Sequence, residues 1–342
     1  MTQKQMSPDE VNEAIRDRYI PLMAPLFYPE RPTGREFIEY FASLLRVVGI
    51  EDKGWDPYTE SRAVLDDLYG LMKIGLPDDK FSDLNLTRWR LGLIFYNHIV
   101  EMAAPYEVIT NLLRFRLGKG YSPNPYWDFL SDSARKQFRR SGLFPKQKIE
   151  IIKKLGKEAG VAIGEIFDEF YQPKLRNAMS HSDFVFAAEG LRSRKDYGID
   201  VLTWSFSELD DLITKAKVFI GTFFALERDA RQFWGTRAKA GIPYDPNFKG
   251  ILEILVDDQN LMNGFKIHWP NGCDSLYRRT SEGIDMLNCM LDLKNATIQL
   301  FVGSYARRRS SFSPLVEFDG TPSYSRLEGS NIDLTWAEIA HG

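Results

Sequence analysis

Positions 176–181 read Arg-Asn-Ala-Met-Ser-His, and three of these six residues could take part in acid–base or phosphate chemistry. The imidazole of His181 can accept or donate a proton near neutral pH. The guanidinium of Arg176 can hold a phosphate through two hydrogen bonds while negative charge builds on it. Together with the carboxamide of Asn177, these are the groups that a metal-free nuclease needs.

The motif is predicted to lie at the end of a helix. Apolar residues at helical spacing between Val161 and Phe170 lead into it, and a polar Ser-Asp pair follows it. Pro173 is expected either to kink this helix or to begin its last segment, because proline cannot continue the hydrogen-bond pattern of a helix interior. The apolar helix before the motif is therefore expected to pack against the core and to hold the polar motif residues at the surface.

Helix geometry places the motif residues on different faces. Asn177 and His181 are four residues apart and share a face, whereas Arg176 and His181 are separated by about 140° around the axis. A bent Arg176 side chain, a helix that ends near Ser180, or a site made from two protomers would each bring the guanidinium and the imidazole together.

The Arg-Asn-x-x-x-His arrangement resembles the signature of the HEPN domains (higher eukaryotes and prokaryotes nucleotide-binding), an Arg followed a few residues later by a His. The resemblance implies a helical domain and a metal-independent endoribonuclease, in which the ribose 2′-hydroxyl attacks the adjacent phosphate and leaves a 2′,3′-cyclic phosphate. It implies that His181 is the general acid or base and that Arg176 stabilises the charged transition state. Asn177 would orient the phosphate or the imidazole.

The same resemblance implies a homodimer, or a higher even oligomer, with the motif helices facing each other, and a place among toxins or antiviral defence proteins. RNA would be the substrate, and a regulatory protein partner is compatible with such a role. Two alternatives stay open. One is a non-catalytic HEPN module that binds a nucleotide or a partner protein, and the other is an interaction protein in which the motif merely ends a helix.

Charge confines any RNA contact to a local surface. The chain has a net charge of −3 and a pI of about 5.9, which excludes binding to nucleic acid through bulk charge. Residues 135–157 nevertheless contain nine Lys or Arg against one acid. This basic segment is either a solvated helix face or a phosphate-binding surface. The candidate RNA- or phosphate-binding residues are Arg114, Arg116, Lys136, Arg139, Arg140, Lys174 and Ser180.

The pattern along the chain predicts a mainly α protein with a small C-terminal antiparallel β domain. Residues 1–80 are expected to form an N-terminal helical extension, 81–240 a HEPN-like helical domain, and 248–342 the β-rich domain, after a linker at 241–247. Helices are expected over 84–117, broken at Pro105, within 135–157, and over 206–234. Strands are expected at 251–256, 265–269, 287–293 and 297–302, and an irregular tail from Arg307.

No cofactor or metal site is expected. His98 and Glu101 are three residues apart on a predicted helix, but without further clustered ligands such a pair is normally part of a helix face. Cys273 and Cys289 lack metal-binding spacing, which indicates reduced structural thiols. No apolar run approaches the length of a membrane span, so a cytoplasmic protein without membrane contact is expected.

Overall fold

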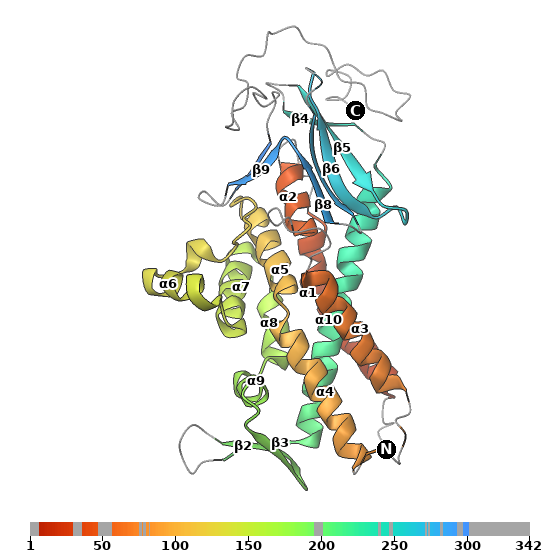
Figure 1. Cartoon of the computed structure of the whole chain (residues 1–342), viewed down its shortest axis with the longest axis vertical. Helices are drawn as coiled ribbons and strands as arrows, with labels where there is room; N and C mark the ends of the chain where they lie inside the picture. The colour runs from red at the N-terminus through yellow and green to blue at the C-terminus, as the bar shows by residue number, and fades with distance from the viewer. Residues whose placement is uncertain are drawn as a thin grey trace. The chain divides into compact units, whose positions relative to one another are not determined.

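The computed structural model describes residues 7–29, 36–46, 57–74, 77, 80–81, 83–194, 201–238, 241–245, 249–270, 272, 274–280, 283–292 and 297–300. The protein is mainly helical, with antiparallel sheets toward its C-terminus, as predicted. Figure 1 shows these elements in chain order. The helices are α1 (Pro8–Phe27), α2 (Glu36–Leu45), α3 (Pro57–Lys73), α4 (Leu84–Glu101), α5 (Ala103–Arg116), the 3₁₀ turn η2 (Trp127–Phe129), α6 (Asp132–Ser141), α7 (Pro145–Ala159), α8 (Ile163–Phe170), α9 (Pro173–Ser180) and α10 (Phe206–Gly235).

The strands form three antiparallel groups: a three-stranded sheet in the order β1-β2-β3, a five-stranded sheet in the order β4-β5-β6-β7-β8, and the pair β9-β10. Each sheet is built from strands that are consecutive in the chain, so it can be joined by short turns. The strands are β1 (Phe184–Ala187), β2 (Gly190–Arg194), β3 (Val201–Ser205), β4 (Ile242–Asp245), β5 (Gly250–Val256), β6 (Met262–His268), β7 (Ser275–Thr280), β8 (Gly283–Leu287), β9 (Cys289–Asp292) and β10 (Thr297–Leu300).

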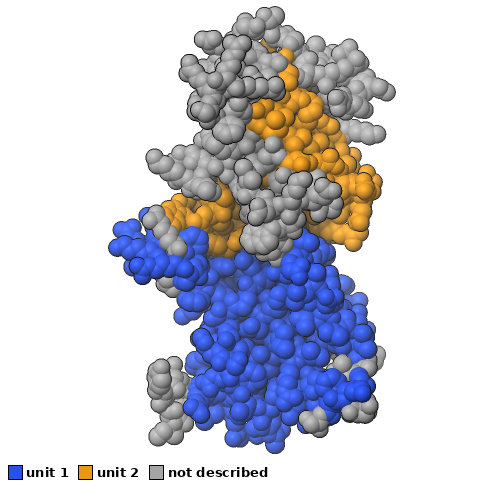
Figure 2. Space-filling view, viewed as in Figure 1, with its two compact units in different colours: residues 1–25, 57–106, 129–225 blue, residues 26–56, 107–128, 226–342 orange. Residues whose placement is uncertain are grey.

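The chain divides into two compact units, shown in different colours in Figure 2. Unit 1 comprises residues 1–25, 57–106 and 129–225, and unit 2 comprises residues 26–56, 107–128 and 226–342. Each unit is assembled from three separate stretches of chain. The three-segment division expected from the sequence stays a prediction.

Two helices begin at a Ser that is followed three residues later by a Glu, the pair that caps a helix N-terminus. Ser7 and Glu10 form a reciprocal capping box at α1: the Ser7 amide donates to Glu10 Oε2 at 2.6 Å, and the Glu10 amide donates to Ser7 Oγ at 3.3 Å. Ser205 and Glu208 repeat the arrangement at α10. The long helix α10 therefore begins directly after β3, with no intervening loop.

Unit 1 has an aromatic core that fixes α8. Phe167 and Phe170 of α8 are buried against Phe219 of α10, with ring centroids 5.2 and 5.0 Å apart respectively, and Tyr106 of α5 lies 5.7 Å from Phe167. Burying a side chain of this size contributes about 2–3 kcal/mol. This cluster makes α8 a rigid support for the motif that follows it.

Unit 2 is organised around a second aromatic cluster and its five-stranded sheet. Tyr40 and Phe41 of α2 surround Trp234 of α10 at centroid distances of 5.9 and 5.4 Å, and Trp234 Nε1 donates to the Tyr40 hydroxyl at 3.3 Å. Within the sheet, Phe265 stacks on Tyr277.

Several expectations are corrected. Residues 135–157 form two helices, α6 and α7, because Gly142 adopts φ +70° and Pro145 begins a new helix. The break expected at Pro105 lies at Met102, since a proline in a first turn needs no amide hydrogen bond. The expected linker at 241–247 contains β4, which pairs with β5.

The sheet β1-β2-β3 in unit 1 was not expected at all. Two expected strands extend into residues 293 and 301–302, and these positions lie outside the described residues, as do Cys273 and the tail from Arg307. Among the helices that the structure describes, none is long and apolar enough to cross a membrane.

Candidate active site on helix α9

The motif lies on a separate short helix, α9, so Pro173 begins a new helix and does not kink a continuous one. Pro173 is its first residue, and α8 ends at Phe170. The buried hydroxyl of Tyr96, from α4, donates to the Phe170 carbonyl at 2.9 Å and accepts from the Gln172 amide at 3.1 Å. Burial raises the pKa of Tyr96 well above its ordinary value, so the phenol stays protonated. One phenol thus satisfies backbone groups on both sides of the break.

The other end of α9 turns sharply into β1. The Ser182 amide donates to the Met179 carbonyl at 3.2 Å and the Asp183 amide to the Ala178 carbonyl at 2.9 Å, the two bonds of a Schellman motif. Ser182 occupies the left-handed region with φ +55°. His181 is the last residue before this turn, and its side chain is exposed.

The hairpin β1-β2 is tied to this turn. Phe184 pairs with Ser193, and the buried Ser193 hydroxyl donates to the carbonyl of Asp183 at 2.6 Å. This bond brings the C-terminal end of β2, with Arg194, against the C-terminal end of α9. Strand β2, which lies outside the motif, therefore forms part of the motif's surroundings.

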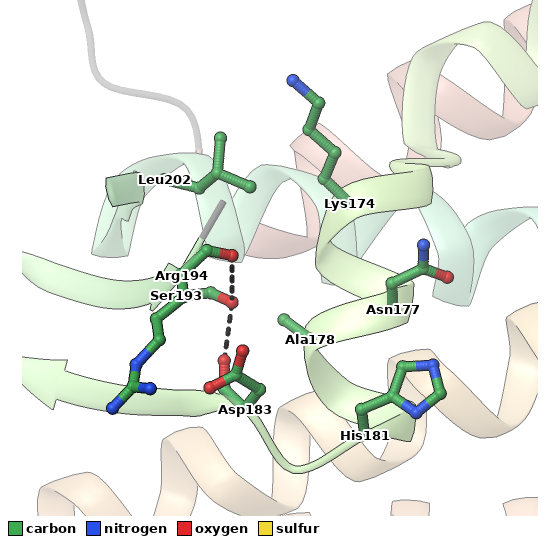
Figure 3. Close-up of a pocket in the computed structure, with 8 residues that line it drawn as sticks. All are labelled: Lys174, Asn177, Ala178, His181, Asp183, Ser193, Arg194 and Leu202. Atoms are coloured by element: carbon green, nitrogen blue, oxygen red, sulfur yellow. Dashed lines mark hydrogen bonds between the residues drawn. The ribbon is translucent and has the colours of Figure 1, made fainter. Parts of the chain in front are cut away.

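A pocket of about 340 Å³ lies between α9 and this small sheet. Figure 3 shows Asn177 and His181 one turn apart on the same side of α9, with the end of β2 across from Ala178. The lining combines an imidazole, an amide, a hydroxyl, two cations and one acid with two apolar side chains. The lining residues are Lys174, Asn177, Ala178, His181, Asp183, Ser193, Arg194 and Leu202.

Arg176 does not line the pocket. Its Nε donates to Glu101, the last residue of α4, its Nη1 donates to Asn177 Oδ1 at 3.2 Å, and the guanidinium carbon lies 5.5 Å from the ring centre of Phe144. The side chain is 14% exposed, and the hydrogen bond to Glu101 raises the pKa of Arg176 against the opposing effect of burial. Arg176 is therefore a fixed cation whose link to the pocket is Asn177.

The pocket residues can bind an anion and move a proton. Among the residues that the structure describes, the His181 ring has no hydrogen-bond partner, so both of its nitrogens are available to a ligand. Asn177 Oδ1 is engaged by Arg176, which leaves its amide nitrogen as a donor. Lys174 and Arg194 add positive charge at the rim. Such a set can receive a phosphate group and exchange a proton with it.

Arg114, expected to bind phosphate, has a structural role. It is buried in unit 2, where it pairs with Asp128 at 2.8 Å and donates to the carbonyls of Lys119, Gly120 and Pro125. The loop that follows α5 folds back over the guanidinium and supplies these acceptors. Arg114 thus belongs to the packing of that loop.

The remaining expected phosphate ligands are distributed over several surfaces. Lys174 lines the pocket, and Ser180, one residue before His181, is exposed but does not line it. Lys136 and Arg140 are exposed on α6, and Arg116 is exposed in unit 2. Arg139 lies in α6, but its side chain is outside the described part of the structure.

Five pocket residues were missed from the sequence: Ala178 and Asp183 beside the motif, and Ser193, Arg194 and Leu202 in the small sheet. The alternating, β-branched and aromatic stretches Phe-Val-Phe-Ala at 184–187 and Val-Leu-Thr-Trp at 201–204, separated by Gly190, are a strand signal that could have revealed the sheet. Which of its residues would face the motif depends on the pairing register, which the sequence does not show.

His98 and Glu101 behave as a helix-face pair. His98 Nε2 lies 2.9 Å from the Ser61 carbonyl, and Glu101 is bound to Arg176. Across the described residues, no group of three or more His, Cys, Asp or Glu side chains is arranged to hold a metal ion.

Comparison with known proteins adds no relative: no family model, no curated protein and no solved structure matches this chain.

Proposed function

We propose that the protein is a metal-independent endoribonuclease of HEPN type, with its active site in the pocket on α9 and unit 1 as a HEPN-like helical domain. The observation that carries the proposal is the exposed imidazole of His181, which lies beside Asn177 in a pocket that also contains Lys174 and Arg194. A proton-transfer group next to phosphate-binding cations is the minimum that RNA cleavage by an internal nucleophile requires.

In the proposed reaction, the 2′-oxygen of the substrate forms a bond to the adjacent phosphorus while the bond from phosphorus to the 5′-oxygen breaks. A base accepts the proton of the 2′-hydroxyl, and an acid gives a proton to the leaving 5′-oxygen. His181 serves one of these transfers. A water molecule serves the other. The products are a 2′,3′-cyclic phosphate and a 5′-hydroxyl.

The substrate would be RNA in an unpaired region. The nucleophile is the ribose 2′-hydroxyl, which DNA lacks. The attacking oxygen must also align with the leaving oxygen, and an A-form duplex holds the ribose away from this alignment, whereas a single strand can rotate into it. A pocket of about 340 Å³ is near the lower end of the range for small-ligand sites, which favours a single splayed nucleotide.

The geometry supports a positioning role for Arg176. In its own chain the guanidinium is bound to Glu101 and Asn177, so it can orient the carboxamide that faces the substrate. The role implied by the HEPN resemblance, direct stabilisation of the transition state, would require Arg176 to leave Glu101 or to face a second protomer. Activity of a mixed dimer of Arg176→Ala and His181→Ala chains separates these roles.

The basic segment would extend the RNA-binding surface. Exposed cations on α6 and α7, among them Lys136, Arg140, Lys154 and Lys157, have no ion-pair partner among the described residues, whereas Lys146 and Lys153 pair with Glu150 and Asp168. Figure 1 shows α6 projecting from the side of α7. Such a surface would attract the phosphates that flank the cleaved nucleotide.

The test is incubation of the purified protein with mixed RNA and excess EDTA, followed by mapping of the product ends. Cyclic phosphates that form with the wild type and not with a His181→Gln variant purified in parallel would support the proposal. Binding of RNA without turnover would instead identify a non-catalytic nucleotide-binding module. If neither protein cleaves or binds RNA, the motif has a purely structural role at the end of a helix.

A further inference from the structure

The end of strand β2 brings to the lining of the pocket a cationic residue, Arg194, that the Arg-Asn-x-x-x-His motif does not contain. Figure 3 shows its guanidinium extended away from α9. Arg194 pairs in register with Val201 of β3 and follows Ser193, whose hydroxyl bonds to the backbone at the end of α9. The backbone of Arg194 is thus held by strand pairing with β3 and by the bond from Ser193 to the turn after His181.

The cations around the site differ in how they are engaged. Arg176 is held by Glu101 and is largely buried. Lys174 and Arg194 are exposed, line the pocket, and form no ion pair with the residues that the structure describes. Neither side chain is held by a carboxylate of the described residues. Figure 3 shows the two side chains pointing away from each other, so both would turn toward a phosphate bound between them.

We propose that Arg194, together with Lys174, binds the phosphate of the RNA backbone in this pocket, and that Arg176 acts on it through Asn177. This inference rests on the proposed function, because it assigns the substrate contact of the same site. The ligand class is a phosphodiester. The sheet β1-β2-β3 is then a part of the active site.

The chemistry of the lining fits a phosphodiester. The guanidinium of Arg194 can bind two phosphate oxygens at once, while the ammonium of Lys174 acts as a point charge. The carboxylate of Asp183 at the same pocket disfavours groups with more negative charge than a diester. Ala178 and Leu202 supply apolar surface on which the ribose of the bound nucleotide can pack.

The chain offers a matched control for Arg194. Arg192 lies two residues earlier in β2 and is likewise exposed, but it binds Glu189 and is not among the pocket residues. A Gln at either position removes one positive charge from the same strand. A difference between the two variants therefore reports the pocket and not the general charge of the sheet.

The test measures binding of a 2′-O-methyl RNA tetranucleotide, which cannot be cleaved, by the full-length protein and its variants. Arg194→Gln and Lys174→Gln should each weaken binding about 10-fold or more and reduce the slope of log K against log salt by about 0.7–1. Arg192→Gln should stay within about twofold of the wild type, and Arg176→Gln, which acts only through Asn177, should lose less affinity than Arg194→Gln. Arg194→Lys should be intermediate, since it keeps the charge and loses the bidentate contact.

Equal losses in Arg192→Gln and Arg194→Gln would overturn the subsite, and a loss in Arg176→Gln as large as that in Arg194→Gln would overturn the indirect role of Arg176. Melting curves identify any variant that fails to fold. If Arg194→Gln fails to fold, the affinity of Arg194→Lys tests the subsite, and an affinity equal to that of the wild type would overturn the bidentate contact. Failure of the proposed function looks different: the wild type would bind the probe through Arg194 but cleave no RNA. Conversely, Arg194→Gln that cleaves normally while His181→Gln is inactive would sink this inference alone.

Discussion

Nη1 of Arg176 donates to Oδ1 of Asn177 at 3.2 Å, so two adjacent motif residues that point to different faces of α9 are nevertheless joined. The bond fixes which end of the Asn177 amide is left for a ligand: the nitrogen, a donor. It also explains how a residue outside the pocket can influence it.

His181→Ala and Arg176→Ala should each lower RNA cleavage at least about 10²-fold while the fold stays intact. A positioned acid or base contributes about this much or more, and loss of Arg176 would leave Asn177 free to rotate. Cleavage rates at saturating RNA and thermal melting curves of both variants are the measurements. Normal activity of His181→Ala, with a melting curve that matches the wild type, would refute the assignment. Arg192→Gln is the surface control.

A mixed dimer of Arg176→Ala and His181→Ala chains should reveal where Arg176 acts. If the active site combines Arg176 of one chain with His181 of the other, mixing restores partial activity, since one of the two sites keeps both residues. If Arg176 orients Asn177 within its own chain, mixing restores nothing. Light scattering at the assay concentration shows whether the dimer exists, and a fully active monomer would exclude the composite site.

Cleavage should continue in excess EDTA. In the proposed mechanism the substrate supplies its own nucleophile, and the charge on phosphorus is met by Lys174, Arg194 and the Asn177 amide. Initial rates with and without EDTA should agree within about twofold, because a twofold change corresponds to less than about 0.5 kcal/mol of barrier. Inhibition by EDTA that magnesium or manganese reverses would mean that the mechanism needs a metal.

Neutralising Lys136, Arg140, Lys154 and Lys157 with Gln should weaken binding of single-stranded RNA and flatten its salt dependence. If all four contact phosphates, the slope of log K against log salt should fall by about 3. A fluorescence titration at several salt concentrations measures it. The control replaces four exposed cations elsewhere in unit 1, namely Arg16, Lys73, Arg88 and Arg90. An equal effect in this control would mean that the basic segment is only a solvated helix face.

His268 should make the stability of unit 2 depend on pH. Its Nε2 lies 2.6 Å from Glu253 and its Nδ1 lies 3.3 Å from Asp274, which also binds Lys266. Burial lowers the pKa of His268, but the hydrogen bonds to Asp274 and Glu253 outweigh it, and the net pKa is raised. The imidazolium therefore stabilises the fold fully below the unfolded pKa of about 6.5, and this stabilisation is lost as pH rises through the folded pKa.

Urea unfolding of the wild type and His268→Gln provides the measurement. The wild type should exceed the variant by about 1–3 kcal/mol near pH 5.5, the cost of leaving buried partners unsatisfied, and by less near pH 8.5. An equal difference at both pH values would show that the folded pKa is not raised.

The helical part of the fold could be predicted because its signals are local. Ser7 with Glu10, Pro173, and the apolar repeat from Phe206 to Trp234 each mark a helix boundary or face, and the structure confirms them. Gly142 was the missed boundary: a glycine followed closely by Pro145 is enough to end one helix and begin another.

The site could be predicted only where residues lie within one turn of each other in sequence. Asn177 and His181 share a face because of helix periodicity. Arg194 comes to the pocket through strand pairing and through the bond from Ser193, and these contacts depend on a pairing register that helix periodicity does not specify. Arg114 shows the converse, since its burial depends on a loop whose path no local pattern specifies.

Helix α9 has eight residues, too few to be stable in isolation. Its two ends are held by other parts of unit 1, by the Tyr96 hydroxyl at one end and by the Ser193 hydroxyl beyond the other. The pocket and the hairpin should therefore open and close together as one cooperative unit, so the backbone amides of 174–181 and of 184–194 should exchange with solvent at a common rate. A bound nucleotide would then slow amide hydrogen exchange along the whole hairpin, although it contacts the hairpin only at Ser193 and Arg194. The exchange rate of the hairpin amides would therefore measure how much of the site is occupied.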